Sequence, residues 1–405
     1  MGRILLIVGA VLLTIPGMAF RLTHTHIDPL IDSAIYGLAV LGAAFMLSWA
    51  AEVAQNDIPR ALALTILALI AVLPEYAVDM YLAWRAADDP ATYGPLALVN
   101  MTGANRLLIG LGWPVVVLIF WLRTRRLKQL RPGIALDHGQ NVEILFLGIA
   151  TLYSFLIPLK GTLDLVDVVI LVAIFGVYAW QVAKAEHVEP DLIGPARLLG
   201  DLPDTPRRLA TFGLFALSGV AIFLVAEPFA ESLIAAGIAL GLDRRTLVQW
   251  LAPLASEAPE FIITGMFAWR LLGAAALGAL VSSKVNQWTL LVGTVPLVYN
   301  IASSVIRKPV PATLELDAVQ RVDLLLTSAQ SYFAVAMLLG LHLSLWEAAL
   351  LAGLFLTQLF VPGTDLIVTG IYLLLGTFFI IRNRSSIVDA LRSIRSGRVA
   401  QDTHA

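Results

Sequence analysis

Two copies of one short motif, in which a proline and a glutamate interrupt a long apolar run, constrain this sequence more than any other feature. The copies read PEYAVDMYLAWRA (residues 74–86) and PEFIITGMFAWRL (residues 259–271), and Pro, Glu, Ala, Trp and Arg recur at the same offsets. A glutamate at membrane depth is energetically costly, so by default it marks a functional site. Because the motif occurs twice in the same setting, it predicts that two halves of the chain share one site.

The composition places the chain among membrane proteins with several spans. Of its 405 residues 59% are hydrophobic and 14% are charged, and the mean hydropathy is +0.83, which excludes an ordinary soluble protein. The net charge of −2 gives no indication of a nucleic-acid partner, and the lack of cysteine excludes thiol chemistry and a thiolate metal site. No H-E-x-x-H, paired aspartates or Ser/His arrangement lies within an apolar run, so we expect neither an enzyme nor a bound cofactor.

Twelve apolar stretches are long enough to cross a bilayer, for which a helix needs about 20 residues. They are residues 3–20, 33–54, 60–85, 95–121, 142–159, 164–183, 210–237, 246–269, 274–305, 322–341, 345–361 and 364–382. The 274–305 stretch is long enough to be broken. The predicted fold class is therefore an all-α polytopic membrane protein with about 12 transmembrane helices.

The spans that carry Glu75 and Glu260 are the third and the eighth, so they cross the membrane in opposite directions. This parity predicts two inverted-topology repeats of five helices, with one extra helix at each end. The predicted parts are an extra N-terminal helix in 1–30, interpreted as a retained span and not a signal peptide, a first repeat in 31–184, a linker in 185–209, a second repeat in 210–362, an extra C-terminal helix in 363–383 and a tail in 384–405. Lys and Arg are more frequent in the loops on the side of the N-terminus, which predicts a cell-membrane protein with both termini in the cytoplasm.

The chemistry of each motif favours a cation. A proline removes one backbone donor and frees a carbonyl one turn earlier, and at membrane depth this is tolerated where the backbone is buried in protein or lines a cavity. Hard cations such as Ca²⁺ bind carbonyl and carboxylate oxygens of this mixed kind. One turn beyond each glutamate lies another oxygen-bearing side chain, Asp79 after Glu75 and Thr264 after Glu260.

The span after each glutamate carries a patch of small and polar residues, NMTGAN in 100–105 and SSKVNQ in 282–287. Small residues let helices approach closely, and amides and hydroxyls supply neutral ligands. Taken alone, each patch could be a packing seam with satisfied polar groups. Its position after a Pro-Glu helix in both halves favours a role in ion binding.

These elements together resemble the calcium/cation antiporter superfamily, whose best-known members are the sodium/calcium exchangers. In that family each repeat carries a G-T-S-x-P-E element, followed one helix later by a G-N-x-x-G-S-N-like element. The resemblance covers residues 33–361, and the Ala-Glu pairs at 51–52 and 230–231 also fit. This chain departs from the pattern at Ala71-Val72 and Ser256-Glu257, which replace Thr-Ser, and at Ala104 and Leu108, which replace a serine and an amide or acid.

The resemblance implies the roles of the site residues. The metal ligands would be Glu75, Glu260, Ser256, Ser283 and Asn100. The residues of the ion pathway or of coupling would be Asp79, Thr264, Glu257, Asn105, Asn286, Gln287 and Ser282.

Two fixed cations, Arg106 and Lys284, enter the same patches. A fixed cation about 6 Å from a Ca²⁺ site would oppose binding by roughly 5–6 kcal/mol at an effective dielectric near 20. We therefore hypothesise that they are tethered substitutes for ions that the family takes from solution, with Lys284 pairing Glu257 or Glu260 and Arg106 lying near Glu75. The alternative is that both form internal salt bridges that only fix helix packing.

The resemblance implies secondary active antiport of inorganic cations across the lipid bilayer, most simply Ca²⁺ against Na⁺ or H⁺, by alternating access around a midplane site formed by Glu75 and Glu260. A monovalent cation/H⁺ antiporter is the first alternative, because hydroxyls are lost and cations are gained. A transporter of an organic or anionic solute that binds Arg106 and Lys284 is the second.

Overall fold

The computed structural model describes residues 2–54, 56–57, 73–182, 192, 194–241, 244–306 and 313–383. These residues belong to two compact units. Unit 1 consists of Met1–Ala104, Glu186–Glu260 and Leu297–Val310, and unit 2 consists of Asn105–Ala185, Phe261–Pro296 and Pro311–Ala405. The predicted tail in 384–405 and most of the predicted linker before residue 194 lie outside the described residues.

Every predicted span is helical where the structure describes it. The helices are α1 (Gly2–Thr23), α2 (Pro29–Ala54), α4 (Leu73–Asp88), α5 (Pro90–Leu107), α6 (Trp113–Arg126), α7 (Asn141–Ser154), α8 (Leu156–Lys160), α9 (Leu165–Val182), α10 (Gly194–Gly200), α11 (Asp204–Ala239), α12 (Arg244–Trp269), α13 (Gly273–Asn286), α14 (Val292–Ile306), α15 (Ala318–Leu338), α16 (Leu345–Phe360) and α17 (Asp365–Arg382). Within the described residues, eight helical segments are long and apolar enough to cross a membrane. The other predicted spans lie in α4, α12, α15 and α16, so the all-α polytopic class is confirmed.

The long 274–305 stretch is not broken, contrary to the possibility raised above. Helix α13 continues through a π-helical turn, Gln287–Leu291, into α14. The same element, Leu108–Gly112, joins α5 to α6. The two π turns begin 179 residues apart, at 108 and 287, so they occupy equivalent positions in the two repeats.

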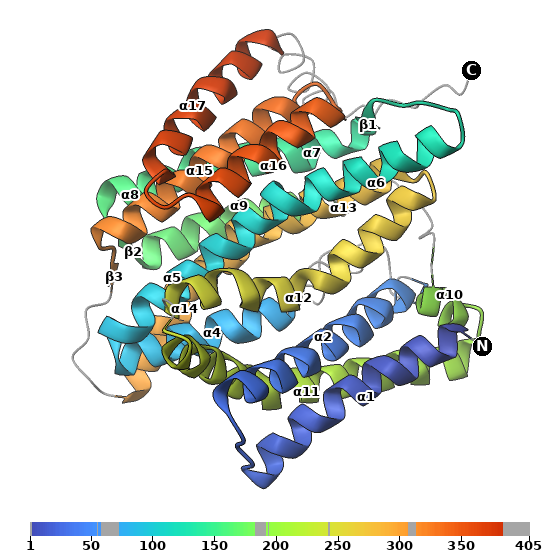
Figure 1. The fold of residues 1–405 in the computed structure, drawn as a ribbon, viewed down its shortest axis with the longest axis vertical. Coiled ribbons are helices and arrows are strands. Elements are labelled where there is room, and N and C mark those ends of the chain that lie inside the picture. Colours follow the sequence, from blue (N-terminus) through green and yellow to red (C-terminus); the bar gives the residue numbers. More distant parts are fainter. Residues whose placement is uncertain are drawn as a thin grey trace. The chain divides into compact units, whose positions relative to one another are not determined.

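Unit 1 is built around α2 and α11, with α1 packed against them (Figure 1). Small residues allow these apolar helices to approach closely: a side chain at Gly42 would meet the backbone of α1 at Ala10. Ala43, Leu47 and Ala221 form a buried cluster on the α2–α11 contact. These small and apolar side chains hold α2 and α11 together along the centre of the unit.

Ion pairs fasten the end of α2 to the start of α11. The carboxylate of Asp57 accepts hydrogen bonds from Arg207 at 2.7 and 3.0 Å and from Arg208 at 2.9 Å. The hydrogen bond from Arg207 is the largest cause that lowers the pKa of Asp57 to about 2, against an ordinary value of 3.8. Asp57 is therefore charged at any physiological pH.

Unit 2 shows the inverted repeat directly in two short antiparallel strand pairs. Strand β1 (Gly133–Ala135) pairs with β4 (His342–Ser344), and β2 (Thr162–Leu163) pairs with β3 (Leu314–Glu315). Ile134 pairs with Leu343, and Leu163 pairs with Leu314. Positions 134 and 314, like 163 and 343, differ by 180, so shifting either pair by one repeat gives the other pair.

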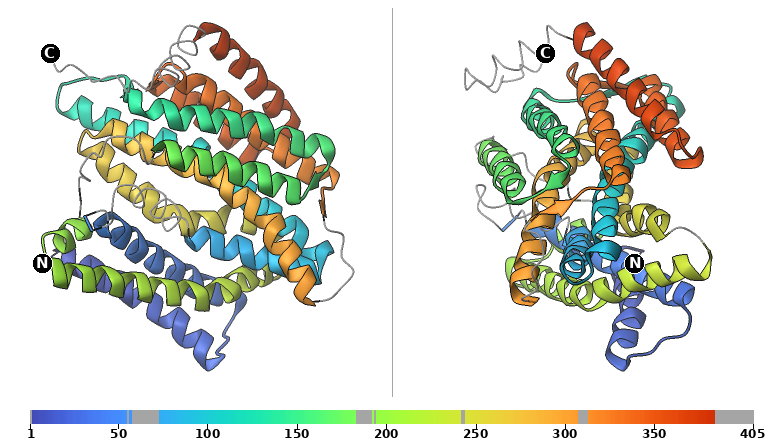
Figure 2. Two further views of the ribbon diagram at one scale, coloured as in Figure 1. Left: turned by 180° about the vertical axis from the view of Figure 1, so that it is seen from behind. Right: turned by 90° about the vertical axis from the view of Figure 1, so that its left-hand side faces the viewer.

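Helix starts in unit 2 follow from their sequences. Asp317 and Gln320 form a capping box at α15, and Ser344 and Glu347 form another at α16, each pair exchanging side-chain and backbone hydrogen bonds. Helices α7, α9 and α13 pack together behind these elements, as Figure 2 shows from the reverse side.

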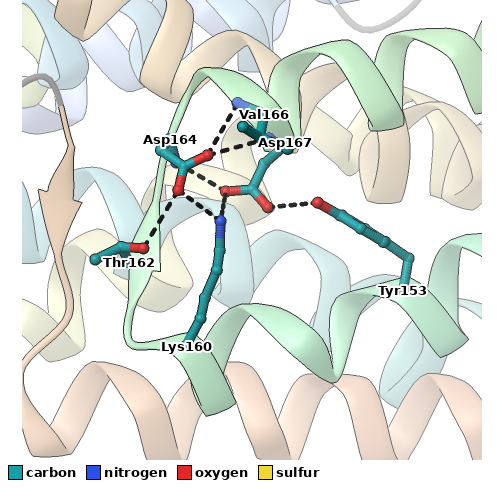
Figure 3. Close-up of polar contacts among 6 residues, drawn as sticks. All are labelled: Tyr153, Lys160, Thr162, Asp164, Val166 and Asp167. Atoms are coloured by element: carbon teal, nitrogen blue, oxygen red, sulfur yellow. Dashed lines mark hydrogen bonds and ion pairs between the residues drawn. The ribbon is translucent and has the colours of Figure 1, made fainter.

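The turn between α8 and α9 is held by Lys160 (Figure 3). Its ammonium lies 2.7 Å from Asp164 and 2.6 Å from the buried Asp167, whose other oxygen accepts a hydrogen bond from Tyr153 at 2.6 Å. Burial alone raises the pKa of Asp164, but Lys160 and the backbone N–H of Val166 lower it below its usual value. Every polar group drawn in this turn has a partner, so the cluster serves the fold.

Candidate functional site

The strongest indication of an ion site lies in unit 1, between α4 and α5. Asp79 and Asn100 are 0% and 1% exposed, and the Asn100 amide donates a 2.7 Å hydrogen bond to Oδ1 of Asp79. The other oxygens of the two side chains, Oδ2 of Asp79 and Oδ1 of Asn100, are buried without a hydrogen-bond partner in the described part of the chain. Buried polar atoms without partners are rare in proteins and costly. The two oxygens of this pair are therefore suited to coordinate a cation.

Glu75 lies one turn before Asp79 on α4 and is 2% exposed. A side chain at i and one at i+4 share a helix face. The predicted ligand and the predicted coupling residue of the first repeat therefore lie on one buried side of α4, together with Asn100 of α5.

Helix α12 approaches α5 at a glycine. A side chain at Gly103 would collide with the backbone carbonyl oxygen of Gln249. Pro253, one turn later, has no N–H to donate to that carbonyl. The contact therefore brings a backbone carbonyl to the helix face that carries Asn100, one turn away on α5.

The second Pro-Glu motif does not end its helix, because α12 continues through Pro253 and Pro259 to Trp269. Glu257 is 2% exposed, and Glu260 is partly exposed. The hydroxyl of Ser256 donates to the carbonyl of Ala252 at 3.2 Å within the helix. All three predicted residues belong to unit 1, as Glu75 does, and their convergence with Glu75 on one ion stays a prediction.

In unit 2 the Lys284 ammonium, which is 0% exposed, lies on the other patch. It donates a 2.5 Å hydrogen bond to Oδ1 of Asn105 and a 3.3 Å bond to the Asn105 carbonyl. Nζ also lies 4.3 Å from the centre of the Trp288 ring, within the range of a cation–π contact. Positions 105 and 284 differ by 179, like the π turns, so equivalent positions of the two repeats contact each other here.

Arg106 is also buried, at 2% exposure, and has a partner that the sequence did not suggest. Its guanidinium lies 3.7 Å from Asp323 of α15, and the Gln330 amide donates to its carbonyl at 3.4 Å. Asp323 falls in the first turn of the predicted span 322–341. An acidic residue inside a predicted span was the feature of the sequence that could have identified it. The predicted proximity of Arg106 to Glu75 and the pairing of Lys284 with Glu257 or Glu260 stay predictions.

The remaining predicted residues lie on unit 2. Ser282 shares a 2.6 Å hydrogen bond with Tyr178 of α9, and Thr264 donates to the Phe261 carbonyl at 3.3 Å. Asn286 and Gln287 are buried at the junction of α13 and the π turn, and Ser283 is partly buried beside them. Among the described residues no group of three or more His, Cys, Asp or Glu could hold a metal ion, so a cation here would depend on amides, hydroxyls and carbonyls as well as carboxylates.

Comparison with known proteins gives a match over both repeats. The family described as sodium/calcium exchanger protein matches residues 33–183 and 210–363. The chain belongs to this family. The matched ranges leave out the first helix, the linker and the last helix, and the resemblance to the calcium/cation antiporter superfamily is confirmed.

Several solved structures resemble the chain over most of its length. The crystal structure of the H⁺/Ca²⁺ exchanger CAX is 41% identical in sequence, with a TM-score of 0.91 and 98% of each chain covered. Native YfkE is 15% identical with a TM-score of 0.59 over 92% of this chain and 99% of that one. The sodium-calcium exchanger NCX_Mj is 17% identical with a TM-score of 0.52 over 80% of this chain and 97% of that one. The last two show the fold alone, and a search of curated proteins gave no significant match.

Proposed function

We propose that this member of the exchanger family is a secondary active antiporter of the cell membrane that exchanges Ca²⁺ against H⁺ or Na⁺, with both termini in the cytoplasm. The observation that carries the proposal is the buried Asp79–Asn100 pair, with two oxygens that lack partners one turn from Glu75. Glu75 and Glu260 supply the carboxylates of the transported ion's site. Of the two counter-ions, H⁺ is favoured because the structure that is 41% identical is that of an H⁺/Ca²⁺ exchanger.

We infer that the two buried cations act as tethered substitutes for soluble ions; the alternative is that they form internal pairs that only fix helix packing. Lys284 and Arg106 have protein partners in unit 2, Asn105 and Asp323. A cation that is already engaged by the protein is poorly placed to capture an anionic solute, which weakens the solute alternative. A fixed charge that fills the place of a soluble ion lowers the number of counter-ions exchanged for each Ca²⁺.

Flux of radiolabelled Ca²⁺ into proteoliposomes tests the proposal. An imposed pH gradient should drive uptake by the wild type, and Glu75→Gln or Glu260→Gln should lower it at least about 30-fold, because losing one partner of a buried charge pair costs 2 kcal/mol or more. Glu315→Gln, which changes an exposed carboxylate of β3, is the matched control. Undiminished flux in both motif variants would refute the assignment, and flux of K⁺ or Na⁺ without Ca²⁺ would favour the monovalent alternative.

A further inference from the structure

Unit 1 contains a cavity of about 490 Å³ that the proposed transport site does not explain. It lies where α1 ends, α2 begins and α11 approaches its C-terminus. Four carboxylates line it, those of Asp28, Asp32, Glu227 and Glu231. Glu75, Asp79 and Asn100 are not among its lining residues.

The cavity carries an excess of negative charge. Arg21 forms an ion pair with Glu227, and with His26 counted as neutral, one guanidinium faces four carboxylates in the lining. Arg85 lies 3.8 Å from Glu231 and reduces the excess to two negative charges. A concave site lined by one sign of charge raises the local concentration of ions of the opposite sign.

Asp32 is positioned by its own loop. It is 5% exposed, and its carboxylate accepts a hydrogen bond from the backbone N–H of Ile27 at 3.2 Å and lies 3.3 Å from Nδ1 of His26. Asp28 uses one oxygen to accept a 2.9 Å bond from the N–H of Leu30. Both carboxylates are thus held by backbone donors at the start of α2 while they face the cavity.

A buried tyrosine in the lining indicates a ligand independently of the charges. Tyr36 is 1% exposed, and its hydroxyl makes no hydrogen bond with any residue that the structure describes. The ring of Tyr36 is thus buried, while its hydroxyl is not among the buried polar atoms and is accessible from the cavity that Tyr36 lines. An open hydroxyl oxygen in a negatively charged cavity is suited to the water shell of a cation.

We propose that this cavity binds one hydrated divalent cation, at a site separate from the one formed by Glu75 and Glu260. Because no three acidic or histidine side chains of the described residues converge on one point, the ion keeps its first water shell and contacts Asp28, Asp32 and Tyr36 through water. The volume is sufficient, since one water molecule occupies roughly 30 Å³. The proposal goes beyond the proposed transport function and does not depend on it.

Glu231 connects the cavity to the helices of the transport site. Its Oε1 accepts hydrogen bonds from Tyr81 of α4 and from Tyr93 of α5, the latter at 2.6 Å. Tyr81 follows Asp79 by two residues on α4. Glu231 therefore links the lining of the cavity to α4 and α5 through these two hydroxyls.

Equilibrium binding of ⁴⁵Ca²⁺ to the full-length protein in detergent tests the proposal. We expect the wild type to bind two ions with different affinities. In Asp28→Asn/Asp32→Asn the affinity for the more weakly bound ion should fall at least about tenfold. In Glu75→Gln/Glu260→Gln the binding of this weaker ion should be retained. Asp201→Asn, which changes an exposed carboxylate of the same unit outside the cavity, should keep both ions. Wild-type binding in the cavity variant, or loss of all binding in Glu75→Gln/Glu260→Gln, would overturn the cavity site. If the transport assignment alone is wrong, Glu75→Gln/Glu260→Gln keeps both ions and the cavity variant still loses one.

Tyr36→Phe separates binding from folding. The change removes no hydrogen bond to a described residue, so the unfolding temperature should stay at the wild-type value, while Ca²⁺ affinity at the weaker site falls about fivefold, the effect of one hydrogen bond. Unchanged affinity in this folded variant would overturn the assignment of the cavity to a cation.

Discussion

The two Pro-Glu motifs occupy equivalent positions in the first and the second repeat, yet the polar groups around them differ in charge. In the first repeat Glu75 is followed one turn later by Asp79, a buried carboxylate with an oxygen that lacks a partner. In the second, Glu260 is followed by Thr264, a neutral hydroxyl that donates to its own helix. In the helix that follows each motif, the first repeat carries the neutral Asn105 where the second carries the cationic Lys284. The Lys284 ammonium donates a hydrogen bond to Asn105.

The difference shows that an inverted repeat conserves backbone geometry more closely than electrostatics. Strand register and π turns recur at offsets of 180 and 179 residues, while the charges at equivalent positions do not match. The first repeat has Asp79 where the second has Thr264, and Arg106 where the second has Val285. The second repeat has Lys284 where the first has Asn105.

The largest expected effect comes from breaking the buried ion pair of Arg106, whose equivalent position at 285 is a valine. Arg106→Gln leaves the carboxylate of Asp323 buried without its cation, so we expect a loss of about 3–5 kcal/mol in the free energy of unfolding. Thermal unfolding of the purified protein measures it. The double variant Arg106→Gln/Asp323→Asn should recover most of the loss, and an equal loss in both would show that the pair has no structural role.

The next effect compares Asp79 with Thr264 directly. Asp79→Asn replaces a carboxylate of the proposed ion site by an amide, and losing one partner of a buried charge pair costs 2 kcal/mol or more, so Ca²⁺ affinity should fall at least about 30-fold. Thr264→Val should change it less than about threefold. Calorimetric titration with Ca²⁺ measures the affinity of both variants. Similar losses of affinity in the two would contradict the inferred difference between Asp79 and Thr264.

Replacement of Lys284 addresses the fixed positive charge. Lys284→Met removes the hydrogen bond that the ammonium donates to Oδ1 of Asn105, which costs about 1–3 kcal/mol, and it removes the charge of the proposed tethered cation. We expect more counter-ions to be exchanged for each Ca²⁺, measured from the reversal potential of flux in proteoliposomes. Lys284→Arg is the control that keeps the charge, and an unchanged ratio in Lys284→Met would leave Lys284 a structural role only.

The smallest effect concerns the end of α2, where the first repeat is fastened by charge. The pKa of Asp57 is lowered to about 2 from 3.8 in the folded chain, so its stabilisation is complete above about pH 4 and is lost as the pH falls towards 2. Its size should be about 1–2 kcal/mol. Acid unfolding followed by intrinsic fluorescence should show this step in the wild type, and Asp57→Asn should lack it.

The fold could be predicted from the sequence because long apolar runs and their parity depend on local composition. The runs at 33–54 and 364–382 became α2 and α17 almost residue for residue. The π turns were not predicted, because each lies inside one continuous apolar helical segment. The two-residue strand β2 could not be found either, since it is too short for an alternating pattern.

The residues of the candidate site were also recognisable, but their partners were not. Glu75, Asp79 and Asn100 were singled out by motif and helix spacing, and the structure joins Asp79 to Asn100. Asp323 was missed as the partner of Arg106 because the two are more than 200 residues apart, and periodicity within a helix carries no information on such contacts. Oxygens that lack partners, such as Oδ2 of Asp79, can be identified only from the three-dimensional structure, because their surroundings depend on how the helices pack.

The strand pairs have a consequence for the origin of the chain. Each ladder takes one strand from the first repeat and one from the second, so a single half would leave two strand edges bare. Two copies of a half-length ancestor, inserted in opposite orientations, could have closed both ladders between them. Fusion of the two genes would then have converted a contact between molecules into one within a single polypeptide, after which each half was free to acquire its own charges.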